Sequence, residues 1–244
     1  MSNPILNNNR FSVQENVLTE EPMTIQGTIN KIFMLFVCLI AGSVISVHYL
    51  LSGNLPMAGM LMGVGALIGF ILVLITCFNI RLSKYLAAPY ALCEGFFIGG
   101  ISSLFEAQYH GIVLQSIFAT FAVLFVMLML YKARFITYTE KFASIIKTGV
   151  LSIAAIYLIQ LVASFFGRGI PLIFEAGPVG LLFSFIVVCF ASFCLIQDFY
   201  FIEESSQRML PKEYEWFGAM GLMITVVWLY TEILRLLAKL NSRR

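Results

Sequence analysis

Three carboxylic acids interrupt long apolar runs of this 244-residue chain. They are Glu94, Asp198 and Glu232, and Asp198 is the only aspartate in the sequence. Arg235 follows Glu232 by one helical turn. A charged side chain at the centre of a bilayer costs about 3 kcal/mol on insertion scales, so such groups usually face a protein interior and serve a function. The chemistry that these residues offer is proton binding and weak coordination of a hard cation.

Two of the acids lie on polar stripes of helical faces. The first stripe falls within about 80° on a helical wheel and comprises Ser184, Ala191, Cys194 and Asp198. The second comprises Gly218, Gly221, Thr225, Trp228, Glu232 and Lys239, with Arg235 at its edge. If the two faces pack together, they form a narrow polar core in which two carboxyl groups share a proton and respond to pH.

Structural roles are the alternative for each of these residues. Glu232 can form a salt bridge with Arg235 near the membrane surface, and Asp198 can be an interfacial residue. Glu94 lies beside a stripe of small residues and can serve either a structural hydrogen bond or permeation. Arg81 or Arg235 can neutralise a carboxylate in a closed state. The sequence leaves these alternatives open.

Composition points to a membrane protein rather than a soluble one. The chain is 60% hydrophobic and 11% charged, whereas soluble domains are about 45–50% apolar and about 25% charged. A net charge of only +2 speaks against a nucleic-acid partner. Seven apolar runs are long enough to cross about 30 Å of hydrocarbon: Ile32–Leu51, Met57–Phe78, Leu86–Phe105, Ile112–Tyr131, Thr148–Phe166, Val179–Ile202 and Trp216–Leu237.

These runs predict an all-α membrane protein with a single domain. We expect a flexible polar N-terminal tail over residues 1–31, a seven-helix transmembrane domain over 32–240 and a basic end over 241–244. Three small-xxx-small pairs, Gly59/Gly63, Gly65/Gly69 and Gly95/Gly99, predict close helix packing. A bilayer is therefore the first partner that the sequence implies.

Positive charges predict the orientation, because Lys and Arg accumulate in cytoplasmic loops. One side carries Arg10, Lys31, Arg81, Lys84, Lys132, Arg134, Lys141, Lys147, Arg208 and Lys212. The loops of the other side carry only Arg168. We therefore expect a cytoplasmic N-terminus. The C-terminal Lys239, Arg243 and Arg244 leave open whether the last segment crosses the membrane or re-enters.

Enzyme motifs are absent from the sequence. It holds no G-x-x-x-x-G-K-[ST], G-x-G-x-x-G or H-E-x-x-H, which excludes the common nucleotide and zinc sites. Ser102 and Ser103 have no histidine deep in another span to act as a base, and an aspartyl protease needs two aspartates. We expect a protein that is not an enzyme and has neither a cofactor nor a firmly assigned metal site.

The depths of the two stripe carboxylates differ if the helices are straight. At 1.5 Å per residue, Asp198 lies about 6 Å before the end of its run at Ile202. Glu232 lies about 24 Å after the start of its run at Trp216. Pairing therefore requires the sixth helix to extend beyond its apolar run, or a break near Gly218 or Gly221.

Three segments resemble the Bax-inhibitor family, in its YccA-type bacterial branch. They are Tyr90–Gly100 (YALCEGFFIGG), Gly111–Phe142 with its ending TEKF, and Trp228–Leu237 (WLYTEILRLL). The resemblance implies a bundle in which the last helix is central, a pH-sensitive calcium leak, and a place in a bacterial inner membrane. It also implies a latch in which one aspartate on each of the last two helices shares a proton. Asp198 falls on the first position, and Glu232 replaces the second aspartate.

Two functions from different classes follow. The first is a proton-regulated cation pathway, with transient Ca²⁺ binding at Asp198 and Glu232 and with Glu94, Arg81 and Arg235 as auxiliary groups. The second is a non-transporting interaction protein, because some bacterial relatives resemble substrates or modulators of a membrane-bound ATP-dependent AAA protease. The polar tail Met1–Gly27 is the feature that such a protease would grip.

Overall fold

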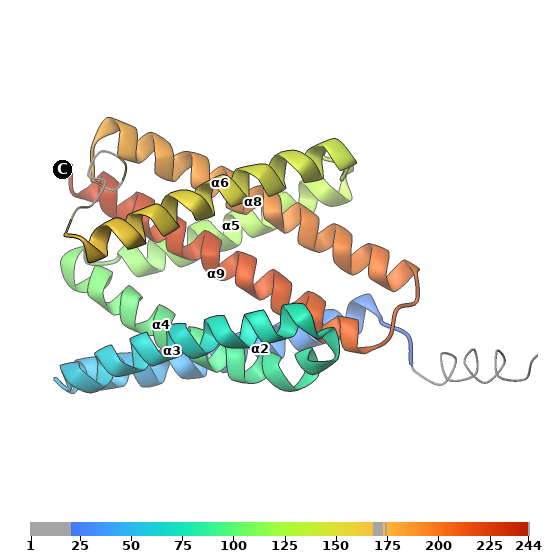
Figure 1. The fold of residues 1–244 in the computed structure, drawn as a ribbon, viewed down its shortest axis with the longest axis horizontal. Helices are drawn as coiled ribbons and strands as arrows, with labels where there is room; N and C mark the ends of the chain where they lie inside the picture. Colours follow the sequence, from blue (N-terminus) through green and yellow to red (C-terminus); the bar gives the residue numbers. More distant parts are fainter. Residues whose placement is uncertain (1–20, 168–172, 174, 244) are drawn as a thin grey trace, which may run out of the picture.

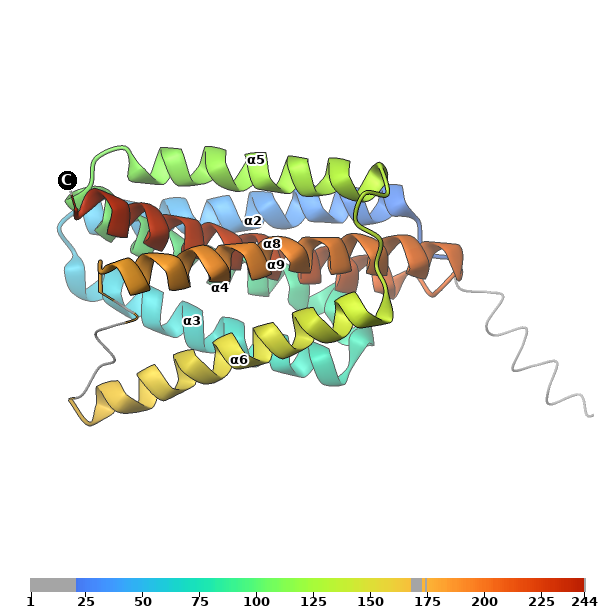
Figure 2. The same cartoon turned by 90° about the horizontal axis from the view of Figure 1, so that it is seen from above.

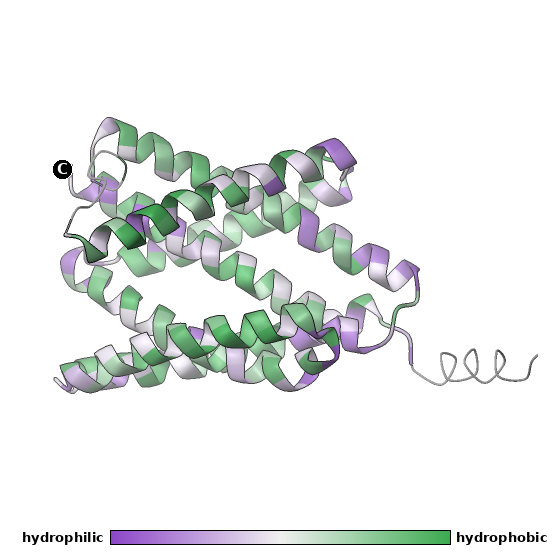
Figure 3. Ribbon diagram, viewed as in Figure 1, coloured by the Kyte–Doolittle hydropathy of each residue, from purple (hydrophilic) through white to green (hydrophobic). Residues whose placement is uncertain are grey.

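Seven long helices form the described part of this computed structural model, which covers residues 21–167, 173 and 175–243 (Figure 1). They are α2 (Ile25–Leu51), α3 (Leu55–Phe78), α4 (Ser83–Gln108), α5 (Ile112–Lys132), α6 (Glu140–Phe165), α8 (Pro178–Gln207) and α9 (Glu213–Asn241), with the short 3-10 helix η1 (Ile80–Leu82) before α4. Each long helix is sufficiently long and apolar to cross a membrane. Hydrophilic residues gather mainly toward the helix ends (Figure 3). The predicted all-α membrane bundle is confirmed.

The last helix, α9, is the centre of the bundle, as predicted. Within its most apolar 18-residue window 78% of residues are buried, against 44% for the next most buried helix, α8. It packs against α2, α4, α5 and α8 and passes through the middle of the molecule (Figures 1 and 2). Its 29 residues form one continuous helix through Gly218 and Gly221, so the structure contains no break there.

Close backbone contact joins α2 to α4 through glycines. A Cβ atom on Gly95 would lie 2.2 Å from the carbonyl oxygen of Leu39, and one on Gly42 would lie 2.3 Å from that of Leu92. Gly99 and Gly65 make similar approaches to backbone atoms of neighbouring helices. Packing is thus confirmed for two of the predicted pairs. The prediction is wrong for Gly59/Gly63. Both glycines are exposed on the outer face of α3, and a Cβ added to either would meet nothing within 4 Å.

The first turn of α9 is tied to the first turns of α2. Glu215 is 1% exposed and forms an ion pair with Lys31. Its Oε1 accepts hydrogen bonds from the backbone N–H (2.9 Å) and hydroxyl (3.0 Å) of Thr24. A Cβ on Gly27 would lie 2.3 Å from the same oxygen, so a side chain there would displace this carboxylate. This buried carboxylate fixes the start of the central helix.

A short segment before α2 also contacts the loop between α8 and α9. Pro22 and Pro211 form an isolated antiparallel bridge, and the N–H of Met23 donates to the carbonyl of Leu210 at 2.7 Å. Glu21 pairs with Lys212. The loop that sets the relative position of α8 and α9 is therefore held by the N-terminal segment.

Helix α2 begins at Ile25 rather than at Ile32, because the Thr24 side chain caps it by accepting the N–H of Gly27 at 3.0 Å. A polar first turn thus precedes the apolar run. The remainder of the predicted tail, residues 1–20 with Arg10, lies outside the described residues, as do Arg168 and Arg244.

Substituting Gly95 tests the close approach of α2 and α4. We expect Gly95→Ala to lower the free energy of unfolding by about 1–3 kcal/mol, because the added Cβ meets backbone that cannot rotate away. Gly63→Ala is the matched control, since its Cβ meets open space and alanine favours the helix. Unfolding of the two variants in detergent micelles provides the comparison, and equal stabilities would contradict the packing.

Candidate functional site

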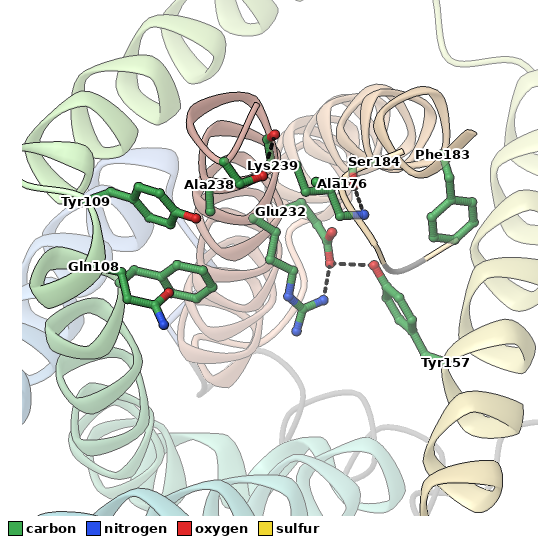
Figure 4. A pocket seen from close by; sticks show the side chains of 12 residues that line it. Gln108, Tyr109, Tyr157, Ala176, Phe183, Ser184, Glu232, Ala238 and Lys239 are labelled. Carbon is green, nitrogen blue, oxygen red and sulfur yellow. Dashed lines mark hydrogen bonds and ion pairs between the residues drawn. The ribbon is translucent and has the colours of Figure 1, made fainter. Parts of the chain in front are cut away.

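Glu232 is a buried carboxylate at the centre of a polar cluster near the C-terminal end of α9. Glu232 is 2% exposed. Its Oε1 accepts hydrogen bonds from the Tyr157 hydroxyl at 2.9 Å and from Arg235 Nη1 at 3.1 Å (Figure 4). It also accepts one from Trp228 Nε1 at 3.3 Å. Trp228 and Arg235 lie one turn on either side of Glu232, so the helix itself brings them to one face. Tyr157 comes from α6 and completes the cluster.

Arg235 forms a salt bridge with Glu232 and remains partly exposed to solvent. Its side chain is 40% exposed, and its guanidinium carbon lies 5.5 Å from the centroid of the Tyr157 ring. The salt bridge that the sequence offered as the structural alternative for Glu232 is therefore present. A cation–π contact adds a second attachment for Arg235.

A cavity of about 350 Å³ opens beside this cluster (Figure 4), near the C-terminal end of α9. Its aromatic walls come from Phe105, Tyr109, Tyr157 and Phe183. Its polar lining comes from Gln108, Ser184, Glu232, Arg235, Lys239 and Ser242. The cavity thus has apolar walls and three charged side chains.

Lys239 reaches across the cavity lining to α8. Its ammonium donates to the carbonyl oxygens of Ile173 and Gly180, both at 3.1 Å, and to the hydroxyl of Ser184 at 2.9 Å. All three acceptors are neutral. Among the described residues no carboxylate lies within ion-pair distance of this ammonium, so its charge remains unpaired there.

Asp198 lies in a different environment, in the C-terminal half of α8. The Thr225 hydroxyl of α9 lies beside its carboxyl group, and the Cys194 side chain is close by. Its Oδ2 is buried and has no hydrogen-bond partner. An oxygen in this state makes ionisation of the group costly unless a partner arrives.

The two polar stripes face each other, but in a register that separates Asp198 from Glu232. Asp198 of α8 lies beside Thr225 of α9. Ser184, fourteen residues before Asp198, contacts Lys239, which is fourteen residues after Thr225. The same register sets the buried Ala191 opposite Glu232. Seven residues, about 10.5 Å of helix, therefore separate the levels of the two acids. No hydrogen bond or ion pair found among the described residues joins them.

Extension of α8 to Gln207 does not remove this offset. From the sequence, pairing of the two acids requires either a longer α8 or a break in α9, and α8 does extend beyond its apolar run. However, α9 also begins earlier than its apolar run, at Glu213, so both helices lengthen by similar amounts at the loop. In this conformation each acid has its own surroundings, with Thr225 beside Asp198 and Arg235 beside Glu232, and direct proton sharing remains a prediction.

Two of the three auxiliary residues, Glu94 and Arg81, lie apart from both acids. Glu94 is half-buried beside the Tyr90 hydroxyl, and one of its oxygens lies 3.4 Å from the position of a Cβ on Gly69 of α3. Arg81 is 83% exposed and lies 4.0 Å from Glu213 at the opposite end of the bundle from the cavity. Of the two arginines, Arg235 alone contacts a stripe acid among the described residues.

Comparison with known families fits this architecture. The family model described as Bax inhibitor 1 like matches residues 3–242. The chain belongs to this family. A search of curated proteins found no match. Membership in the Bax inhibitor 1 like family and seven apolar helices together make the chain an integral membrane protein.

Sequence reasoning missed Tyr157 and assigned no role to Lys239. Tyr157 lies in an apolar run of α6 with no motif around it, and Lys239 was noted on the stripe without a role. Helical spacing relates residues of one helix only, so a contact from α6 to Glu232 has no signal in a single sequence. Among the described residues, no group of three or more potential metal ligands gathers at the site or elsewhere.

Neutralising Glu232 tests its position in the protein. We expect Glu232→Gln to lower the free energy of unfolding by about 1–2 kcal/mol, because charge-assisted hydrogen bonds from Arg235 and its neighbours weaken. Glu204→Gln is a matched control, because Glu204 pairs with Arg208 at 2.6 Å near the solvent. Loss of the Glu204–Arg208 ion pair should lower the free energy of unfolding by no more than about 0.5 kcal/mol. Equal losses in denaturation experiments would show that Glu232 is not buried as described.

Proposed function

We propose that this protein is a proton-regulated cation pathway of the membrane, with calcium as the expected cation. The observation that carries the proposal is the presence of two buried carboxyl groups, Asp198 and Glu232, on the facing stripes of α8 and α9. A carboxyl group within a membrane bundle is costly to keep when it serves packing alone. Family membership supports the same function.

The two acids have different tasks in this proposal. Glu232 is held by Arg235, Tyr157 and Trp228, so a cation can use its oxygens only after the Arg235 contact opens. Asp198 has a buried oxygen with no partner, so adding or removing a proton there changes the charge of the α8–α9 interface directly. Proton binding at Asp198 would therefore alter the packing of α8 on α9.

Weak binding follows from the number of oxygens that the site offers. Calcium takes six to eight oxygen ligands. Two carboxyl groups separated by about 10.5 Å along the helix cannot supply such a shell together. A pathway needs transient binding rather than a tight site, so this arrangement suits passage better than storage.

Other groups that could produce a pH response must be separated from the two acids. The Lys212 ammonium donates a hydrogen bond to Glu21 and attracts it, which holds the pKa of Glu21 below 4.5. The same contact holds the pKa of Lys212 above 10.5. Both groups therefore stay ionised from about pH 6 to 8 and do not respond there. His48 and His110 are the two histidines of the chain and both are exposed, so a variant that lacks them serves as a control.

Calcium uptake into liposomes that contain the purified protein tests the proposal. We expect flux that changes between about pH 6 and 8, and loss of that pH response in an Asp198→Asn/Glu232→Gln variant, because its interface carries no titrating carboxyl group. Glu204→Gln should behave as the wild type. A His48→Gln/His110→Gln variant should keep the response.

Two results would contradict the proposal. Folded wild-type protein that gives no flux above empty liposomes at any pH would exclude the cation pathway. Flux whose pH response survives in the double carboxyl variant but disappears in the histidine variant would assign proton sensing to the surface histidines instead.

A further inference from the structure

We propose that the cavity at the C-terminal end of α9 binds the phosphate group of an anionic phospholipid, with Arg235 as the principal ligand. The proposal concerns a binding site and does not require the protein to conduct ions. It begins from the charges around the cavity. Arg235 and Lys239 line it together with a single carboxylate, Glu232, which leaves an excess of one positive charge among the described lining residues.

Hydrogen-bond capacity identifies the group that can bind an anion. The Lys239 ammonium has three donors, and its three neutral acceptors use all of them. It therefore contributes positive potential without a free donor. Arg235 has five N–H donors, and the contact with Glu232 at 3.1 Å uses Nη1. Its planar fork is partly solvent-accessible and matches the oxygens of a phosphate group.

The remaining lining suits a ligand with an apolar part. Phe105, Tyr109 and Phe183 provide aromatic surface. Gln108 and the Tyr109 hydroxyl add polar groups to the lining of the same cavity (Figure 4). A simple hydrated cation would meet two positive side chains here and gain nothing from the aromatic walls. An amphipathic anion satisfies both kinds of surface.

The position of the cavity indicates a lipid as the source of the phosphate. Helix α4 ends at Gln108, α9 ends at Asn241 and α8 begins at Pro178, and residues near all three helix ends line the cavity. Ends of membrane helices and interfacial tyrosines lie at the level of lipid headgroups. The guanidinium of an arginine at this level matches the oxygens of a lipid phosphate.

Competition between Glu232 and the ligand for Arg235 predicts that removing the Glu232 charge strengthens ligand binding. Both use the guanidinium of Arg235, so removing the Glu232 charge frees the arginine. We expect Glu232→Gln to bind phosphate-bearing ligands about five- to tenfold more tightly than the wild type. A purely structural role for this salt bridge predicts no such gain.

The experiment measures binding of short-chain phosphatidylglycerol, and separately of inorganic phosphate, to the full chain in neutral detergent by calorimetry. Arg235→Gln alone would leave Glu232 buried without a partner, so the test uses Glu232→Gln/Arg235→Gln, which removes both charges. We expect this variant to bind at least about tenfold more weakly than Glu232→Gln. Arg208→Gln, at the opposite end of the bundle, should match the wild type.

The two ligands distinguish the sources of the phosphate group. Binding of phosphatidylglycerol without binding of inorganic phosphate would identify the lipid, and equal binding would show that a free phosphate suffices. Equal affinity of Glu232→Gln and the double variant, or no binding of either ligand to folded wild type, would overturn the site. Neither outcome depends on ion flux, so this site and the proposed cation pathway can fail separately.

Discussion

Because α9 is enclosed by other helices, every polar side chain that it carries must find a partner inside the protein or accept the cost of burial. At its start Glu215 takes Lys31 and the Thr24 N–H and hydroxyl from α2 and its cap. Near its end Glu232 takes donors from α6 and from its own helix. These contacts fix both the height and the rotation of the central helix, and the positions of the surrounding helices follow from it.

The register between α8 and α9 is the consequence that matters most for function. It brings Asp198 to Thr225 and Ser184 to Lys239, and it leaves Glu232 opposite an alanine. A direct meeting of the two acids would require a slide of about two turns, about 10.5 Å. The loop between these helices is anchored by Met23 and Glu21, which opposes such a slide. In this arrangement the acids are therefore separate groups.

Much of the fold was predictable, because apolar length and small-residue spacing report membrane helices and their packing directly. The stripe that carries Asp198 and the stripe that carries Glu232 also face each other as their spacing suggested, and counting residues anticipated their offset. The partners from other helices were not predictable: Lys31 for Glu215 and Tyr157 for Glu232 lie 184 and 75 residues away in the chain. A helical wheel cannot relate residues of different helices, and Gly59 and Gly63 show that a small-residue pair alone does not reveal which face is covered.

The central claim of the proposed function is that Asp198 and Glu232 bind protons as two separate groups in this conformation, in place of the shared proton that the sequence predicts. Infrared difference spectroscopy during a pH titration measures this directly, because each protonated carboxyl group gives its own carbonyl stretching band. The account predicts that Asp198→Asn removes one band and leaves the titration midpoint of Glu232 unchanged. A large shift of the Glu232 midpoint in Asp198→Asn, together with a large shift of the Asp198 midpoint in Glu232→Gln, would show strong coupling and contradict the account.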